Sequence, residues 1–221
     1  ETETLLSKIA DLRYIRNPEN LGFLRSCNRA ATFARGSYVL FLNNDTLVLP
    51  GWLDAIVDTF HEFPKAGLVG SKLIYPNGNL QEAGGVIWQD ASGINYGRDG
   101  DPYRPEYNYL REVDYCSGAA ICVPLNVWHA LEGFDELFSP AYYEDADLAF
   151  RIREQGYQVL YQPCSQIFHV EGVTSGTDVS TGIKHYQAVN REKFLDRRKT
   201  SLSTHGNPSD PEIITRNRAR K

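Results

Sequence analysis

Residues 37–46, which read SYVLFLNNDT, constrain the fold more than any other part of the chain. Their first half is a continuous apolar run over residues 38–42, as is typical of a strand that is covered on both faces. Two amides and a carboxylate, Asn43, Asn44 and Asp45, follow this run directly. In a sheet flanked by helices, ligands gather at the carboxyl ends of the strands. We therefore expect a buried strand that ends in a polar site.

The other predicted elements alternate between helices and strands. Apolar residues at helical spacing predict helices over residues 1–10, 23–34, 51–63, 124–132, 143–155 and 180–200. Apolar runs predict further strands over residues 12–16, 66–70, 72–88 with a turn at Asn77–Gly78, 118–124 and 157–162. Residues 90–112 are expected to form a long loop. This order predicts an α/β protein in which a mostly parallel central sheet is flanked by helices and carries a small antiparallel insertion.

The length and charge of the chain suggest one domain and a tail. A chain of 221 residues can bury one sizeable core, and we expect a single domain over residues 1–200 with a basic, flexible tail over residues 201–221. The net charge is −5, but residues 191–221 carry +5 and residues 1–190 carry −10. An acidic body argues against nucleic acid as the main partner. The tail is expected to be solvated, and its contact with anionic lipid is the open alternative.

Several features point to the cytoplasm. No apolar run approaches the ~20 residues that a membrane-spanning helix needs, and the first residues lack the layout of a signal peptide. The four cysteines form no C-x-x-C pair, which is typical of reduced, mostly buried thiols. We expect a cytoplasmic protein, with peripheral contact to the inner face of the membrane left open.

Two polar clusters contain carboxylates that could carry chemistry. Asp45, with its two amide neighbours, could hold a divalent cation, which takes hard oxygen ligands; an Asx-type turn that only ends the strand is the alternative. Glu144 and Asp145, near a predicted helix start, could supply a general base. Negative charge at that place also favours the helix dipole and caps free N–H groups, which is the simpler explanation.

A third cluster surrounds His169, which follows an apolar strand. A lone histidine in such a place is more often structural than a ligand. Glu171, Thr174 and Ser175 follow it closely, and these polar neighbours favour a metal or phosphate site. From the residues alone, both alternatives stay open.

In chain order, five segments resemble the family 2 glycosyltransferases of the GT-A fold. They are NPENLGFLRSCNRAA, GSYVLFLNNDTLVLPGWL, CSGAAICVP, GFDELFSPAYYEDADLAFRIREQGY and FHVEGVTS, and they span residues 17–175. The combination of NLGF…CN, LNNDT and ED-x-DL…R…G is highly specific. The resemblance implies transfer of a sugar, with inversion, from a nucleotide diphosphate donor of the UDP or dTDP type to a hydroxyl of a saccharide or lipid-linked saccharide acceptor.

The resemblance also implies roles for particular residues. NNDT corresponds to the DXD-type motif, so Asp45 is expected to bind Mn²⁺ or Mg²⁺ on the donor diphosphate, and His169 to complete the metal site. Asp145 corresponds to the catalytic base, with Glu144 beside it. The expected nucleotide-sugar-binding residues are Asn20, Gly22, Asn28, Asn43, Asn44, Asp45, Gly118 and Ala119. A homodimer is left open.

One departure from the family pattern concerns the N-terminus. Members normally begin with a strand–helix–strand unit that holds uracil and ribose, and Glu1 lies where this unit should already have ended. The resemblance therefore leaves two expectations: an active, metal-dependent transferase, and a truncated, non-catalytic module that binds nucleotide diphosphate or serves as a partner subunit. A nucleotidyltransferase is disfavoured, because no glycine-rich phosphate loop occurs early in the chain.

Overall fold

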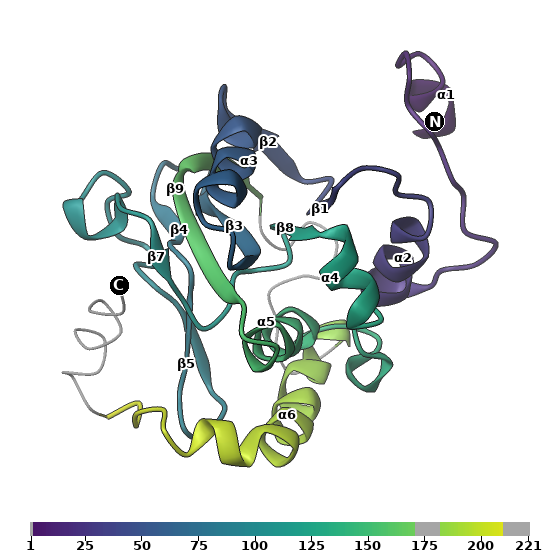
Figure 1. The fold of residues 1–221 in the computed structure, drawn as a ribbon. Coiled ribbons are helices and arrows are strands. Elements are labelled where there is room, and N and C mark those ends of the chain that lie inside the picture. Colours follow the sequence, from purple (N-terminus) through teal and green to yellow (C-terminus); the bar gives the residue numbers. More distant parts are fainter. Residues whose placement is uncertain (1, 171–181, 210–221) are drawn as a thin grey trace.

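A seven-stranded mixed sheet forms the centre of the computed structural model, which describes residues 2–170 and 182–209. Its strand order is β1 (Tyr38–Leu42), β8 (Ala120–Pro124), β3 (Ala66–Ile74), β9 (Gln158–His169) and β2 (Thr46–Val48) (Figure 1). Two short strands lie off this path: β4 (Leu80–Glu82) pairs with β3, and β7 (Arg111–Glu112) pairs with β9. A second, two-stranded antiparallel sheet consists of β5 (Gly85–Ile87) and β6 (Gly93–Asn95).

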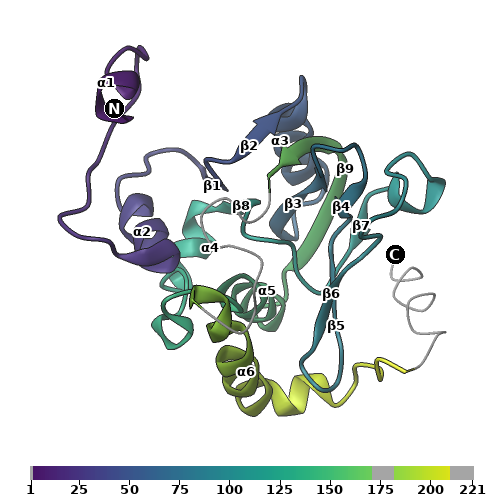
Figure 2. The same ribbon diagram turned by 180° about the vertical axis from the view of Figure 1, so that it is seen from behind.

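Helices cover both faces of the central sheet. α3 (Trp52–Glu62) packs on one face through Ile56 and Phe60. α2 (Gly22–Ala31), α4 (Leu125–Ala130) and α5 (Glu144–Glu154) pack on the other. α6 (Tyr186–Leu202) packs beside α5, and the described part of the chain also contains the 3₁₀ turns η1 (Pro105–Tyr107), η2 (Glu136–Phe138) and η3 (Gly182–His185). The short helix α1 (Thr2–Leu6) lies apart from this body in both ribbon views (Figures 1 and 2).

The strands contribute to both cores because successive side chains of a strand point to opposite faces. In β8, Ile121 and Val123 pack on the α5 face, whereas Cys122 packs on the α3 face. In β3, Leu68 and Val69 divide in the same way. Burial on both faces explains why β8 and the first half of β3 are apolar, whereas Ser71 and Lys72 are buried polar residues later in β3.

The expected mostly parallel sheet is wrong in detail, because the sheet is mixed. Among the strands of residues 2–170, β3 and β9 form the one parallel pair, and β8 runs antiparallel to both β1 and β3. A doubly covered strand is apolar whichever way it runs, so the sequence pattern carries no direction. β1, β3 and β9 nevertheless point the same way, since β8 opposes both of its neighbours. Their carboxyl ends therefore meet at one edge of the sheet, where β8 begins.

Three local expectations are also corrected. Residues 12–16 form no strand: Leu12 and Tyr14 are 45% and 42% exposed, and no neighbouring strand pairs with this segment among the described residues. Residues 90–112 are more regular than expected, since they contain β6, η1 and β7. Leu202 and His205 are buried, so the packed part of the chain extends beyond residue 200, the predicted domain boundary.

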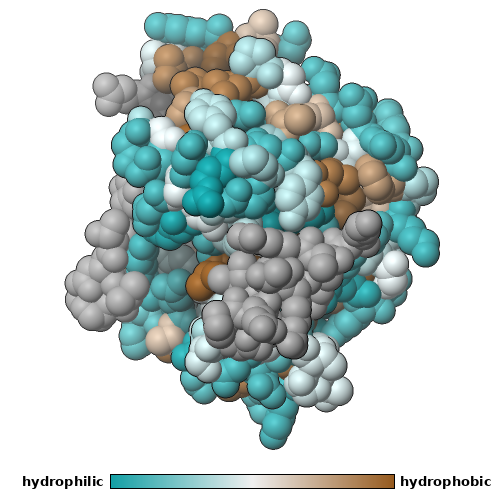
Figure 3. All heavy atoms as spheres, turned by 90° about the vertical axis from the view of Figure 1, so that its left-hand side faces the viewer, coloured by the Kyte–Doolittle hydropathy of each residue, from teal (hydrophilic) through white to brown (hydrophobic). Residues whose placement is uncertain are grey.

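Other expectations agree with the structure. The turn at Asn77–Gly78 joins β3 and β4, with Gly78 at φ +89°. All four cysteines are free thiols, and Cys164 is exposed. No helix among the described residues is long and apolar enough to cross a bilayer. The face in Figure 3 is largely hydrophilic, with apolar residues in separate patches.

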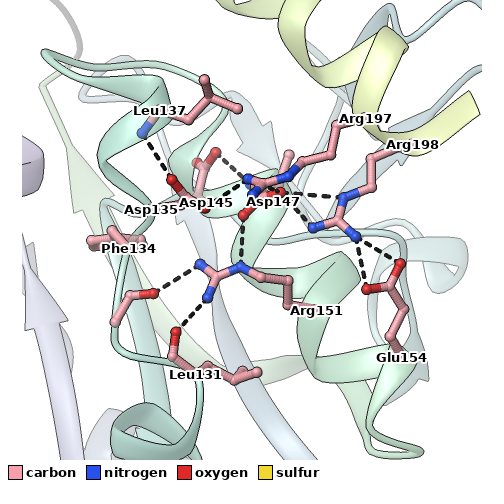
Figure 4. Close-up of polar contacts among 12 residues, drawn as sticks. Leu131, Phe134, Asp135, Leu137, Asp145, Asp147, Arg151, Glu154, Arg197 and Arg198 are labelled. Carbon is pink, nitrogen blue, oxygen red and sulfur yellow. Dashed lines mark hydrogen bonds and ion pairs between the residues drawn. The ribbon is translucent and has the colours of Figure 1, made fainter.

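A buried ionic network joins α5 to α6 and to the loop before η2 (Figure 4). Asp147 is fully buried, and its carboxylate accepts hydrogen bonds from Arg151 at 2.6 Å and from Arg198 at 2.6 Å. Arg151 also donates to the carbonyls of Leu131 and Gly133. Every charge in the centre of this network therefore has hydrogen-bonded partners, which a buried ion pair requires.

Asp147→Ala is expected to lower the free energy of unfolding by about 3–5 kcal/mol, because two arginines then lose the buried carboxylate that they share. Urea denaturation measures this loss. The control is Glu136→Ala, which breaks an ion pair with Arg25 whose side chains are 55% and 54% exposed. This control should cost less than about 1 kcal/mol. Equal losses in the two variants would contradict the role given to Asp147.

Candidate active site

Asp45 and His169 face each other at the edge where β1 and β9 end. Strand β2 returns antiparallel to β9 with Thr46 opposite His169, and the Val170 N–H donates to the Asp45 carbonyl at 3.0 Å. This pairing brings the Asp45 Oδ1 atom to 3.3 Å from the His169 Nε2 atom. Both side chains are mostly buried. The two residues are 124 positions apart, and the sheet alone brings them together.

The turn after β1 contains the residues of NNDT. Thr46 closes the turn by donating its hydroxyl to the Asn43 carbonyl at 2.6 Å. Asp45 Oδ1 is buried and makes no hydrogen bond. Asp45 therefore does not serve as the cap of an Asx-type turn through this atom. Asn43 is half-buried and Asn44 is exposed beside it.

The Asp45–His169 pair fits a divalent cation. The Nδ1 atom of His169 lies 3.0 Å from the Gln81 Oε1 atom, an acceptor that favours a proton on Nδ1. In a neutral ring, the Nε2 lone pair then faces the carboxylate of Asp45, as it would towards a shared cation. Within residues 2–170 and 182–209, no third His, Cys, Asp or Glu joins them. Two protein ligands suit Mg²⁺ or Mn²⁺, because donor phosphates and water supply the rest.

Asp145 lies in the first turn of α5 and is half-buried. Its Oδ2 atom accepts a hydrogen bond from the Gly118 N–H at 3.0 Å, and its Oδ1 atom accepts one from the Ala146 N–H at 2.8 Å. Burial raises the pKa of Asp145 above its ordinary value, and these two N–H donors only partly oppose that effect. A carboxylate that is fixed in orientation and has a raised pKa is suited to accept a proton.

Gly118 and Ala119 connect the two carboxylate-bearing segments. While Gly118 donates to Asp145, the carbonyl of Ala119 accepts a hydrogen bond from the Asn43 N–H at 2.9 Å. A Cβ atom on Gly118 would lie 3.4 Å from the Phe23 ring of α2 and 3.7 Å from the Cβ of Asp145. The start of β8 thus lies between α2, the end of β1 and α5.

Glu144 is the first residue of α5 and is buried. It is 6% exposed, its carboxylate accepts from the backbone N–H groups of Glu144 and Tyr142, and its Oε2 atom makes no hydrogen bond. Burial, and next the charge of Asp145, raise the pKa of Glu144 well above its ordinary value. Burial, and then the charge of Glu144, raise the pKa of the Cys27 thiol to about 12. A catalytic role for Glu144 stays a prediction.

The loop before α2 lies next to this site, but Asn28 is directed elsewhere. Asn20 accepts a hydrogen bond from the Gly22 N–H at 2.9 Å, and Gly22 has φ +70° beside the Pro140 carbonyl. The amide of Asn28 donates to the Phe134 carbonyl at 2.8 Å and accepts from the Phe134 N–H at 2.9 Å. Asn28 therefore fixes the chain before η2. Nucleotide contacts of Asn20 and Gly22 stay a prediction.

Sequence reasoning missed the contribution of β4. Gln81 orients His169, and Glu82 accepts a hydrogen bond from the Ser117 N–H at 2.8 Å, next to Gly118. The one available signal is the Gly84–Gly85 pair that follows, because a Cβ on Gly85 would lie 1.9 Å from the Tyr115 ring. The predicted neighbours Glu171, Thr174 and Ser175 lie outside the described residues.

A strained turn leads into α5. Tyr142 and Tyr143 have φ +73° and +71°, in the left-handed region that large residues rarely adopt. Each such residue costs roughly 1–3 kcal/mol, so the surrounding contacts must hold the turn in place. Asn190 of α6 supplies part of this support, through a hydrogen bond to the Tyr142 carbonyl.

Two solved structures share this fold at low sequence identity. GalNAc-T7 with UDP, GalNAc and Mn²⁺ has a TM-score of 0.63 and 13% identity over 91% of this chain and 44% of that one. The mannosyltransferase PcManGT from Pyrobaculum calidifontis, in complex with GDP-Man and Mn²⁺, has a TM-score of 0.52 and 15% identity over 92% of this chain and 50% of that one. The fold is the GT-A fold, as the sequence predicts.

Residues 1–114 match the family model described as Glycosyl transferase family 2. The O-antigen biosynthesis protein RfbC of Myxococcus xanthus is 32% identical over 188 residues, which are 80% of this chain and 14% of that protein. The N-acetylglucosaminyl-diphospho-decaprenol L-rhamnosyltransferase of Mycobacterium tuberculosis is 24% identical over 217 residues, or 87% of this chain and 69% of that protein. This chain belongs to glycosyl transferase family 2.

Glu144→Gln is expected to raise the melting temperature at about pH 7.5 and to leave it nearly unchanged at about pH 4. Because the pKa of Glu144 is raised in the folded protein, its carboxyl group holds a proton more tightly there than in the unfolded chain. Stability is therefore lost as the pH rises from the ordinary glutamate value, about 4.3, towards the higher folded pKa. Glutamine keeps the shape without the charge.

Calorimetric melting of Glu144→Gln across this pH range tests the expectation, with Glu62→Gln on the exposed side of α3 as its control. The expectation would be contradicted if Glu144→Gln raised the melting temperature equally at about pH 4 and about pH 7.5. It would also be contradicted if the melting temperature fell near neutral pH.

Proposed function

We propose that this chain is the catalytic domain of an inverting glycosyltransferase that moves a sugar from a nucleotide diphosphate donor to an acceptor hydroxyl. One observation carries the proposal. The adjacent residues Gly118 and Ala119 bind, through their main chain, both the Asp145 carboxylate and the strand end that bears Asp45. A candidate proton acceptor and a candidate diphosphate site are thereby fixed relative to each other.

On the donor side, Asp45 and His169 would hold Mn²⁺ or Mg²⁺. When bound, the cation supplies charge stabilisation for the leaving diphosphate. Gln81 keeps the His169 ring in orientation, and Asn43 and Asn44 lie beside the pair. The two structural neighbours support this assignment, since each is described with a nucleotide or nucleotide sugar and Mn²⁺. A UDP- or dTDP-type donor is part of the proposal.

On the acceptor side, Asp145 would take the proton of the attacking hydroxyl. The Gly118 and Ala146 N–H groups fix its orientation, and its raised pKa favours proton acceptance at the moment of attack. A single displacement by a hydroxyl inverts the anomeric centre. Asp145 must therefore act from the side of the sugar opposite to the leaving diphosphate, and it would not share the cation.

The acceptor is proposed to be a saccharide or a lipid-linked saccharide. Two relatives, the O-antigen biosynthesis protein RfbC and the N-acetylglucosaminyl-diphospho-decaprenol L-rhamnosyltransferase, support this class by their names. Cytoplasmic location, peripheral contact with the inner face of a membrane and a homodimer belong to the same proposal.

Asp145→Asn is expected to reduce sugar transfer by about 10²–10⁴-fold, because the amide cannot accept the hydroxyl proton. Release of nucleoside diphosphate from a panel of UDP- and dTDP-sugars measures the rate, and calorimetry with UDP and Mn²⁺ measures binding, which should be kept. Asp58→Asn on the exposed side of α3 is the control. Loss of UDP binding to the same degree as transfer would remove Asp145 from the role of base.

Asp45→Ala is expected to abolish the difference in UDP affinity with and without Mn²⁺, because one of the two proposed protein ligands is removed. Titration calorimetry on this variant and on Asp58→Ala compares the two conditions. A Mn²⁺ effect that survives in Asp45→Ala would contradict the metal site. Mn²⁺-dependent UDP binding without any turnover in the unmodified protein would favour the non-catalytic binding module instead.

A further inference from the structure

We propose that Asn190, on α6, is a positioning residue for the reaction: it holds the strained turn at Tyr142–Tyr143 and thereby sets the place of the Asp145 carboxylate. This inference rests on the role proposed for Asp145. Nothing in the sequence points to Asn190, which lies 45 residues beyond Asp145 in the helix that packs beside α5.

The Asn190 side chain is fully buried and directed at one loop. Its Nδ2 atom donates to the carbonyls of Phe138 at 2.7 Å, Ala141 at 2.9 Å and Tyr142 at 3.0 Å. Its Oδ1 atom accepts a hydrogen bond from Lys193 at 2.9 Å, which fixes which end of the amide faces the loop. The two hydrogens of the Nδ2 atom are thus shared among three carbonyl acceptors. These acceptors require a hydrogen-bond donor at the position of the Nδ2 atom.

The peptide groups of Tyr142 are held from two sides. Asn190 binds the carbonyl of Tyr142, while the Glu144 carboxylate accepts a hydrogen bond from its N–H. The carbonyl of the next residue, Tyr143, accepts from the Asp147 N–H of α5 at 2.8 Å, and its side chain is held by its hydroxyl bond to the Ala91 carbonyl at 2.8 Å and by its ring, 5.3 Å from that of Phe194. Asn190 is therefore the α6 contact that acts on the main chain of the turn.

The position of Asp145 depends on this turn. Tyr143 precedes the first residue of α5, so a change in the left-handed dihedrals at Tyr142 and Tyr143 would rotate the start of the helix. Asp145 is in the first turn of α5, and its Oδ2 atom accepts a hydrogen bond at 3.0 Å from the Gly118 N–H, which lies just before β8. A small rotation there moves the carboxylate away from the position that Gly118 and the proposed acceptor require.

Loss of Asn190 should leave α6 in place. Other contacts of the same helix hold it independently: Arg198 binds Asp147 and Glu154, Arg197 binds Asp135, and the Phe194 ring is fully buried. A variant at position 190 therefore tests the turn rather than the docking of the helix.

Asn190→Ala is expected to lower the turnover number about 10- to 100-fold, while the dissociation constant for UDP with Mn²⁺ stays within about twofold. The amide proton of Gly118, deshielded by the Asp145 carboxylate in the unmodified protein, should shift upfield in NMR spectra of folded Asn190→Ala. The matched control is Asp196→Ala, an exposed residue on the same helix α6. Both readouts should be unchanged in this control.

A rescue separates positioning from a merely structural role. Glycine adopts positive φ without strain, so Tyr142→Gly in the Asn190→Ala background should restore most of the turnover and the downfield Gly118 signal. Tyr142→Gly alone, in which Asn190 is retained, sets the reference for loss of the tyrosine ring. Restoration of both readouts supports the proposal.

The proposal is overturned if folded Asn190→Ala keeps both the turnover number and the Gly118 shift. It is also overturned if turnover and UDP affinity fall together in this folded variant, or if the glycine variant restores neither readout. The Gly118 signal needs no turnover. If the unmodified protein transfers no sugar, the proposed function fails, while this signal still decides whether Asn190 positions Asp145.

Discussion

Two main-chain hydrogen bonds at the start of β8 determine how the candidate site is assembled. Gly118 donates to Asp145, and Ala119 accepts from Asn43, so one short segment ties α5 to the end of β1. This arrangement requires β8 to run against its neighbours. Were β8 parallel to β1 and β3, residues 118–119 would lie at the opposite end of the sheet. The mixed sheet is thus a condition for the site.

Local patterns predicted the elements well where burial decides the pattern. The apolar run of β1 and the helical spacing of α3 and α5 each correspond to an observed element. Strand direction was not predictable, because a strand buried on both faces is apolar in either direction. The segment 12–16 has a strand-like composition, but hydrogen-bonded neighbours make a strand, and propensity does not supply them.

The candidate site was predictable where its residues are adjacent in sequence. NNDT and the Glu144–Asp145 pair are short motifs, and the resemblance placed His169 beside them. Gln81, Glu82 and Asn190 were missed because each acts on a residue distant in sequence and belongs to a type with many ordinary uses. For Asn28, a family match suggested a nucleotide contact that the structure does not favour, because its amide is hydrogen-bonded to the Phe134 backbone.

Buried polar groups attach α6 to the rest of the domain in two ways. Charged contacts from Arg197 and Arg198 hold the helix as a body, and a neutral amide, Asn190, reaches the main chain of the loop before α5. Asp147 belongs to the first group although it lies two residues from Asp145. The same stretch of α5 therefore carries both the residue proposed for chemistry and the residue that anchors the helix.

The division of the site between two supports has an evolutionary consequence. Asp45 and His169 depend on the β1–β2–β9 edge, whereas Asp145 depends on α5, and the main chain of Gly118 and Ala119 connects the two among the described residues. Because Gly118 and Ala119 contribute main-chain atoms to this connection, substitutions around it that keep the Asp145 carboxylate need not disturb it. Descendants of such a domain can change the surroundings of Asp45 and His169 while inheriting those of Asp145 intact, and laboratory selection could diversify the two halves in separate libraries.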